Sequence, residues 1–335
     1  MGPTIKDVAE HAHVAISTVS RVLNNKDRVS PETRKAINKA IEELGYVRNN
    51  FAASIKTGET RFIAVVVPEI RNEFYTSVIE GVEAVASKQG YYTLVYTTGG
   101  IYSKEQKVFE GEFSHIVDGI ILTPSQTDYV FYQKNSKPTV TIDREVPNSN
   151  MYSVCVDNYK GTALLMNELI RFGHKKIAII SGPLVFNIGI DRMNGYLDVL
   201  KEKKLPIREE YIRVGDWFEE DGYRLTNQLL ELPDPPTAIL AMNNLICIGS
   251  AECLCDKGLQ IGRDISLVGF DDSVMARYLG PGITCVRRAT SEMGERGAEI
   301  LLALLQDRAD EICKKKEVLG VELIRRGSIV KIEET

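Results

Sequence analysis

Apolar residues follow two different spacings along this chain, and the change between them divides the sequence into two parts. In the N-terminal part they recur every three or four positions, which is the spacing of amphipathic helices. Ile5, Val8, Ala9 and Ala12 form one such stripe, and Val19, Val22 and Leu23 form another. From Phe62 onward, short apolar runs rich in β-branched residues alternate with helical stretches instead. The chain is therefore predicted to join a small helical head to a larger α/β body.

The N-terminal pattern predicts three short helices around one core. Thr4 can cap the first helix, because Asp7 follows it by three residues. Ser30 followed by Pro31 indicates the start of the third helix, and Gly45 indicates its end. The inner face of this third helix is expected to comprise Ala36, Ile37, Ala40, Ile41 and Leu44.

The second predicted helix keeps polar residues on the edge that faces away from this core. Two short helices joined by a tight turn are a common way to place a helix in the DNA major groove. The candidate contacts on its outer face and leading end are Ile16, Ser17, Ser20 and Arg21. Arg21 can bind guanine O6 and N7 bidentately, whereas Ile16 can contact a thymine methyl group.

The body is predicted to contain parallel sheets covered on both faces. Strand-like runs lie at residues 62–67, 93–96, 119–122, 140–142, 177–180, 238–241 and 265–268, with another strand near Ile212. Helices are expected from about Phe74, over 103–116, up to Phe172, over 191–203 and 219–230, and after the run at 238–241. Ligands of such sheets bind at the carboxyl ends of the strands.

Composition limits the class of protein. A chain of 335 residues with 44% hydrophobic content is long enough for two or three globular domains. It has no run of eighteen or more apolar residues. Its first residues predict a capped helix, whereas an export leader would have a basic segment followed by an apolar one. We therefore expect a cytoplasmic protein without membrane association. The six cysteines are expected to be reduced, and Cys253 and Cys255 lack the spacing of a zinc site.

The formal net charge of -5 is distributed unevenly along the chain. Through Arg61 there are ten Lys and Arg residues against seven Asp and Glu residues, so the head carries +3 and the remainder -8. This asymmetry fits an electrostatic footprint for DNA that is confined to one end. Because the excess is small, tight binding is expected to need two heads side by side, as in a dimer on a palindromic operator.

Several longer motifs resemble those of the lactose-repressor (LacI/GalR) family of transcription regulators, over residues 4 to 335. They are DVAEHAHVAISTVSRVLN, VSPETRKAINKAIEELGY, VDNYKG at 156–161, FGHKKIAIISGP at 172–183, TAILAMNN at 237–244 and DISLVGFDD at 264–272. A single helix-turn-helix match is a common accident, but an ordered set of motifs along one chain is not.

The resemblance implies a domain organisation. Residues 1–47 would form a helix-turn-helix DNA-binding domain, and residues 48–60 a hinge helix with its linker. Residues 61–158 with 290–319 would form the N-terminal effector subdomain, and residues 159–289 with 320–332 the C-terminal one. Both subdomains would be doubly wound parallel sheets like those of periplasmic sugar-binding proteins, and an effector would bind between them.

The DNA contacts implied by the family pattern lie in the head and in the hinge. In the head they are Thr4, Ile16, Ser17, Thr18, Ser20, Arg21 and Asn24, and in the hinge they are Asn49, Ala52 and Ile55. Ile55 stands where the family has a leucine that wedges between base pairs in the minor groove. The chain departs from the family pattern at His13, Ala15, Arg48 and Ala53. A plain flexible linker is the alternative reading of the hinge.

Six residues are candidate effector contacts. Asp143, Asn243 and Asp271 each follow a predicted strand, and Phe74, Arg192 and Trp217 match positions where the family contacts its ligand. The alternatives are an ordinary core role for Phe74, a surface turn for Asp143 and an exposed salt bridge for Arg192. Asn244 departs from the family, which commonly has aspartate there.

Counting two carboxylates and one guanidinium among these residues, we predict a neutral sugar or glycoside as effector and no cofactor. A homodimer is expected, because the C-terminal residues lack the leucine heptads that form tetramers in some relatives. Effector binding is expected to alter the pairing of the two hinge helices in this dimer.

The predicted function is allosteric regulation, expected to be repression, of carbohydrate genes. One alternative is a relative whose corepressor is a phosphorylated carrier protein, and another is a sugar-binding protein without a DNA role. An enzyme is not expected, because His11, His13, His115 and His174 form no catalytic motif and no glycine-rich phosphate loop follows a strand. His174 is expected to cap a helix end.

Overall fold

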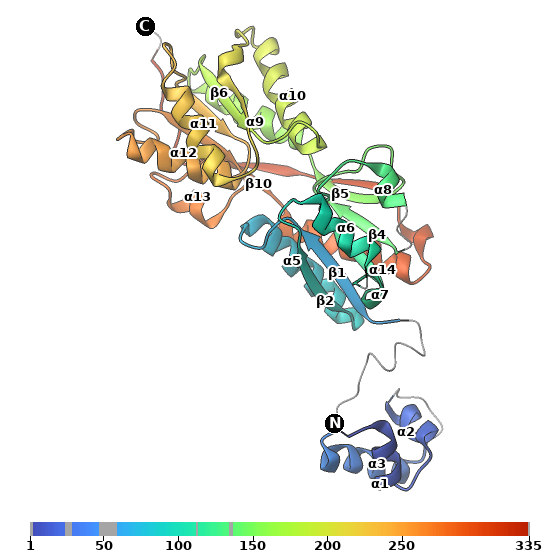
Figure 1. Cartoon of the computed structure of the whole chain (residues 1–335). Helices are drawn as coiled ribbons and strands as arrows, with labels where there is room; N and C mark the ends of the chain where they lie inside the picture. Colours follow the sequence, from blue (N-terminus) through green and yellow to red (C-terminus); the bar gives the residue numbers. More distant parts are fainter. Residues whose placement is uncertain (1–2, 24–28, 47–58, 112, 134–136, 334–335) are drawn as a thin grey trace. The chain divides into compact units, whose positions relative to one another are not determined.

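A computed structural model describes residues 3–23, 29–46, 59–111, 113–133 and 137–333 of the chain. The chain separates into two compact units, a head (Met1–Thr60) and a body (Arg61–Thr335). Figure 1 shows both units and the labels of their elements. The predicted contacts Asn24, Asn49, Ala52 and Ile55 lie outside the described residues.

The head contains the three helices predicted from the apolar spacing. They are α1 (Ile5–His11), α2 (Ile16–Leu23) and α3 (Pro31–Leu44). The Thr4 hydroxyl accepts a hydrogen bond from the Asp7 amide, and the Asp7 carboxylate accepts one from the Thr4 amide at 2.6 Å. Ser30 caps α3, and Gly45 ends it in the left-handed conformation at φ +61°. Both capping predictions are confirmed.

One small apolar core joins the three helices of the head. Its buried members are Val8, Ala9, Val19, Val22, Ile37 and Ala40. Leu23, Ile41 and Leu44 are partly buried against this core, as are Ile5 and Ala12. Ala36 is exposed, so its assignment to the inner face of α3 was wrong.

The body contains two six-stranded sheets. The first has the order β11-β5-β4-β3-β1-β2, and its strands all run parallel. They are β1 (Phe62–Val67), β2 (Tyr92–Thr97), β3 (Gly119–Leu122), β4 (Thr139–Ile142), β5 (Tyr152–Val156) and β11 (Lys316–Leu319). The second has the order β12-β10-β9-β8-β6-β7. Its strands are β6 (Ile177–Ser181), β7 (Ile212–Val214), β8 (Ala238–Ala241), β9 (Ser266–Phe270), β10 (Thr284–Arg288) and β12 (Val321–Ile324).

Helices cover both faces of each sheet, as the strand-helix alternation predicts. The first sheet packs with α5 (Glu73–Ala86), η1 (Ser87–Gln89), α6 (Tyr102–Glu110), α7 (Phe113–Ile116), α8 (Tyr129–Gln133), α14 (Thr290–Leu305) and η3 (Ala309–Glu311). The second packs with α9 (Asn158–Arg171), α10 (Asn187–Glu202), η2 (Glu209–Tyr211), α11 (Glu219–Leu230), α12 (Asn244–Asp256) and α13 (Val274–Tyr278). We call each sheet with its helices the first half and the second half of the body.

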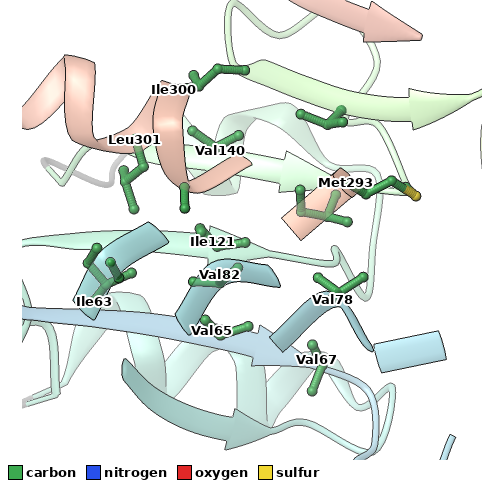
Figure 2. Close-up of a cluster of buried hydrophobic side chains, with 14 of the residues drawn as sticks. Ile63, Val65, Val67, Val78, Val82, Ile121, Val140, Met293, Ile300 and Leu301 are labelled. Atoms are coloured by element: carbon green, nitrogen blue, oxygen red, sulfur yellow. The ribbon is translucent and has the colours of Figure 1, made fainter. Parts of the chain in front are cut away.

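Alternate residues of β1, which lies between β3 and β2, contribute to both cores of the first half. Ile63, Val65 and Val67 pack against α5 and α14, while Ala64 and Val66 point to the opposite face, toward α6 and α8. Figure 2 shows the first of these cores, with side chains from α5 and α14 over the strands. Because both faces of β1 are covered, the run FIAVVV needs no polar position.

Several elements of the body were not predicted. They are the strands β5, β10, β11 and β12 and the helices α8, α13 and α14. The helix expected over residues 103–116 is instead two helices, α6 and α7, because α6 ends at Glu110 and the next residue, Gly111, is extended. Strand β12 pairs with β10 in the antiparallel direction, so the second sheet is not wholly parallel.

His174 caps the end of α9, as predicted, because its amide donates to the Leu169 carbonyl oxygen at 3.2 Å. Its side chain is buried, and its Nδ1 lies 2.8 Å from the Thr237 hydroxyl. Its Nε2 lies 2.8 Å from the Ser266 hydroxyl and 3.0 Å from the Val330 carbonyl oxygen. The imidazole therefore joins segments of the second half that are distant in sequence. Burial lowers its pKa, which keeps it neutral.

The described helices include none long and apolar enough to cross a membrane. Among the cysteines, Cys155, Cys247, Cys253 and Cys285 are buried thiols, whereas Cys255 and Cys313 are exposed. In the part of the chain that the structure describes, histidine, cysteine and carboxylate side chains form no group of three or more suited to a metal ion.

Helices α5 and α14 touch through glycines, which allows one testable prediction about stability. A Cβ atom at Gly81 would lie 2.0 Å from the Ser291 carbonyl oxygen, so Gly81→Ala must push the two helices apart. We expect a loss of about 1–3 kcal/mol in the free energy of unfolding, measured by urea denaturation. Glu83→Ala, at an exposed position of the same helix, is the control and should change little. Equal stability of the two variants would contradict this packing.

Candidate functional site

Helix α2 of the head presents a polar outer face. Val19 and Val22 are buried in the core of the head, whereas Ile16, Ser17 and Arg21 are exposed. Thr18 and Ser20 are half-buried. Ile16 keeps 44% of its surface exposed, although it is apolar and opens the helix. The five predicted contacts on α2 therefore lie on its solvent-facing side and flanks, where base edges could be reached.

The turn before α2 and the cap of α1 show how two further residues are used. His13 adopts φ +50°, in the left-handed region that glycine favours, so it carries the turn despite its side chain. The Thr4 hydroxyl donates to the Asp7 carboxylate at 2.8 Å. The Thr4 amide and hydroxyl lower the pKa of Asp7, which keeps the capping carboxylate charged. This capping role does not test the DNA contact predicted for Thr4, which stays a prediction.

The body contains a cavity of about 450 Å³ at the carboxyl ends of both sheets. All six predicted effector residues line it: Phe74, Asp143, Arg192, Trp217, Asn243 and Asp271. Phe74 and Asp143 belong to the first half, and the other four belong to the second. Further lining residues include Glu69, Asn72, Tyr75, Arg144, Phe186, Asp216, Asn244 and Arg288. The structure thus brings together positions that span almost two hundred residues of sequence.

Arg288, which the sequence analysis missed, occupies the centre of this group. Its Nη1 donates to Asp143 Oδ1 at 2.7 Å, and its Nε donates to Asp271 Oδ1 at 2.5 Å. Its guanidinium also lies 3.9 Å from the centre of the Phe74 ring. Burial opposes the charged form of Arg288, but Asp271 and Asp143 outweigh burial and raise its pKa. Asp143 is thus a buried ion-pair partner, not the surface turn residue of the alternative reading.

Both carboxylates depend on unusual backbone conformations. Asp143 has φ +68° and Asp271 has φ +88°, in the region where side chains other than glycine are rare. The Asp143 amide donates to the Val154 carbonyl oxygen and the Asp271 amide to that of Val286, each at 2.9 Å. Neighbouring strands therefore hold both residues in place, and this backbone strain lies beside the cavity at the carboxyl end of each sheet.

Arg192 also binds groups of its own chain. Its Nε donates to Asn158 Oδ1 at 2.8 Å, and its Nη1 donates to the Met242 carbonyl oxygen. Its guanidinium stacks 3.8 Å from the Phe270 ring centre and 5.6 Å from that of Trp217. Burial, reinforced by the charge of Arg288, lowers the pKa of Arg192 to about 10. The exposed salt bridge considered for Arg192 is therefore absent, since only 1% of the residue is exposed.

Asparagine side chains fix the walls around Trp217 and Phe74. Asn243 caps α12 by accepting from the Ile246 amide at 2.7 Å, and its Nδ2 donates to the Trp217 carbonyl oxygen at 2.9 Å. Asn72 Oδ1 accepts from the Phe74 amide and from Asn244 Nδ2, at 3.0 and 2.9 Å. An aspartate at 244 has no such donor, which gives the departure from the family pattern a physical reason.

Three polar atoms of the cavity wall are buried without a hydrogen-bond partner among the described residues. They are Arg144 Nε, Trp217 Nε1 and Asp271 Oδ2. The first two can donate a hydrogen bond, and the third can accept one. Unpaired buried polar atoms are costly, so atoms of this kind around one cavity indicate where a polar ligand can bind.

Sequence signals for the missed residues were weak or indirect. Arg288 ends β10, whose sequence TCVRR has two charged residues and therefore does not resemble a buried strand. Arg144 directly follows Asp143, and its Nη1 donates to the Pro124 carbonyl oxygen at 3.1 Å. Its guanidinium lies 4.6 Å from the centre of the Phe186 ring, which comes from the other half. Only the strand-end rule, applied to every strand, would have suggested these arginines.

Comparison with known proteins adds two family matches. Residues 4–49 match the family "Bacterial regulatory proteins, lacI family", and residues 166–329 match "Periplasmic binding protein-like domain". The chain is 31% identical over 328 residues to the HTH-type transcriptional repressor CytR of Escherichia coli (strain K12), covering 97% of this chain and 96% of CytR.

Solved structures show the same architecture over nearly the whole chain. A Lac repressor dimer bound to operator and the anti-inducer ONPF superposes with a TM-score of 0.87 at 26% identity, covering 98% of this chain and 100% of that one. The transcriptional regulator CelR, in complex with cellobiose, gives a TM-score of 0.72 at 30% identity, with 97% and 99% covered.

The packing of Trp217 on Gly182 gives a prediction that needs no ligand. A Cβ atom at Gly182 would lie 2.2 Å from the indole ring, so Gly182→Ala should displace the one tryptophan of the chain. We expect its fluorescence emission to shift to longer wavelength as the ring becomes more exposed. Gly320→Ala is the matched control, because a Cβ atom there meets nothing within 4 Å. Identical spectra for the wild type and Gly182→Ala would show that Trp217 is not held as described.

Proposed function

This chain belongs to the lacI family of bacterial regulatory proteins, and from that membership we propose that a small neutral sugar or glycoside controls its affinity for operator DNA. The chain is a DNA-binding transcription regulator with an effector-binding body, and it is not an enzyme. The fold is the α/β architecture of the family, with a helix-turn-helix head.

The single observation that carries the effector proposal is the composition of the cavity wall. Six residues nominated from sequence meet there, and Arg144 Nε, Trp217 Nε1 and Asp271 Oδ2 have no partner among the described residues. A hydroxyl group both donates and accepts, so neighbouring hydroxyls of a sugar can satisfy all three atoms. The half-buried ring of Trp217 offers apolar surface for a sugar ring, whereas Arg288 covers the ring of Phe74.

The charge of the lining supports a neutral ligand, although for a different reason than the sequence suggested. The cavity has three arginines where the sequence analysis counted one guanidinium, and these stand against four carboxylates: Glu69, Asp143, Asp216 and Asp271. The Nε and Nη1 donors of Arg192 and Arg288 already bind groups of their own chain. Among the described lining residues, Arg144 keeps one unpaired buried donor, Nε, and a phosphate dianion needs more donors than that.

Known relatives support the same class of ligand. The CelR structure holds cellobiose, and the Lac repressor structure holds the anti-inducer ONPF. By analogy we assign carbohydrate genes to this regulator, with repression as the direction of control. The remaining parts of the proposal are a homodimer in the cytoplasm, a palindromic operator, and the division into head, hinge and two effector subdomains given above.

For DNA, the proposal assigns base contacts to the exposed face of α2, supported by Thr4. Arg21→Ala should cost about 1–3 kcal/mol of operator affinity and relax the preference at one base pair in each half-site. The measurement is selection from randomised duplexes followed by titration at fixed salt. Lys35→Ala, at an exposed position on α3, is the control for a general loss of positive charge. Uniform weakening on all sequences would mean that Arg21 contacts only phosphate.

For the effector, titration calorimetry with cellobiose, other neutral glycosides, sugar phosphates and nucleosides tests the class of ligand. We expect heat of binding from a neutral glycoside, together with a change in Trp217 fluorescence, because Trp217 lines the cavity. Asn243→Ala should weaken that binding, since Asn243 anchors the backbone of Trp217. Binding confined to phosphorylated or purine-containing compounds would refute the proposed class.

A further inference from the structure

We propose that Arg288 is a latch that holds the two halves of the body together across the cavity by binding a carboxylate from each. The inference rests on the proposed function only in treating this cavity as the effector site. It concerns what occupies the cleft before any effector binds and what an effector must displace.

The position of Arg288 in the chain makes it suited to this role. It is the last residue of β10 in the second sheet, and α14, which packs on the first sheet, begins two residues later. In the β10–β12 ladder Arg288 lies opposite Val321, immediately after the segment that leaves β11 of the first sheet at Gly320. The guanidinium thus lies beside two of the segments through which the chain passes between the halves.

The contacts of Arg288 divide between the halves. Asp271 follows β9 of the second sheet, and Asp143 follows β4 of the first. The side chain of Arg288 is 3% exposed, and those of Asp143 and Asp271 are 5% and 9% exposed, so water screens these pairs little. Buried carboxylates require a charged partner, and one guanidinium serves both.

Other hydrogen bonds also cross the cleft, among them three that each include at least one uncharged group. Asn244 Nδ2 donates to Asn72 Oδ1 at 2.9 Å, and the Glu145 amide donates to Asn187 Oδ1 at 2.9 Å. The Val274 amide donates to the Glu73 carboxylate at 2.8 Å. None of these three hydrogen bonds joins two opposite charges. Without Arg288, Asp143 and Asp271 would lose the cation that hydrogen-bonds both of them, because the hydrogen bonds of the neighbouring Arg192 go to Asn158 and Met242. The like charges of the two carboxylates would then favour separation of the halves.

The latch also occupies groups proposed for the effector. Arg288 covers the ring of Phe74 and binds one oxygen of each carboxylate, so it engages three of the six candidate effector residues. An effector whose hydroxyls bind Asp143 or Asp271 therefore has to compete with an internal cation. Arg288 consequently favours ligands that hydrogen-bond both Asp143 and Asp271, because a ligand that reaches only one carboxylate replaces only one of the two ionic hydrogen bonds.

Two native cysteines allow a direct test in the full-length protein without effector or DNA. Cys255 on α12 of the second half and Cys313 before β11 of the first half are exposed, and the other four cysteines are buried. Nitroxide labels on these two thiols report the distance between the halves by pulsed electron paramagnetic resonance. An excess of unlabelled protein suppresses distances between protomers.

The test compares Arg288→Gln with Arg287→Gln. Arg287 lies on the same strand but pairs with Asp272 and Glu322, both of the second half, so it is the matched control. We expect Arg288→Gln to add a longer-distance population and Arg287→Gln to leave the wild-type distribution unchanged. A wild-type distribution for Arg288→Gln, or equal changes in both variants, would overturn the latch.

If Arg288→Gln does not fold, as judged by circular dichroism, Asp143→Asn decides the question. Asparagine tolerates the left-handed backbone of position 143 and removes the charge that Arg288 binds across the cleft. A shift in the same direction, smaller because the amide oxygen still accepts a hydrogen bond, supports the latch, and an unchanged distribution overturns it. The proposed effector class is untouched by either result, because no effector is present.

Discussion

Charge buried between two sheets is the constraint on which the rest of this body depends. Arg192 and Arg288 lie with Asp143 and Asp271 at the carboxyl ends of both sheets, and each has at most 8% of its surface exposed. Charges removed from water in this way must find partners, and they find them among residues of both halves. In the proposed latch, the groups that hold the halves together are also the candidate contacts of a ligand. The same residues would then set both the proposed preference for a neutral polar ligand and the relation between the two walls of the cavity.

Connectivity explains how such a cavity can influence the rest of the chain. Strand β10 belongs to the second sheet, the following helix α14 packs on the first, and β11 and β12 belong to different sheets although only Gly320 separates them. Any change in the relation of the halves must bend these few segments, because each sheet is covered on both faces and packed as a unit. Hinge motion of this type is a common basis of allosteric control.

Sequence was most informative where local pattern and burial agree. FIAVVV could be predicted as a strand because a strand that is covered on both faces has a continuous apolar sequence. The cap formed by Thr4 and Asp7 could be predicted because the two hydrogen-bonding side chains lie within one helical turn. The rule that ligands bind at the carboxyl ends of strands correctly predicted that Asp143 and Asp271 line one cavity. It could not show that both pair with Arg288, since 145 residues separate Asp143 from Arg288 and TCVRR has the polarity of an exposed segment. Long-range ion pairs have no periodic signature, so they were found only in the structure.

The central claim is that occupation of the cavity changes the affinity of the head for DNA. The direct measurement is the affinity of the full-length protein for its selected operator, with and without a saturating compound that binds the cavity. The account predicts a change of about 5–150-fold, which corresponds to a coupling free energy of 1–3 kcal/mol, and the reciprocal change in the compound's affinity when DNA is bound. An operator affinity that stays the same at saturation would contradict it.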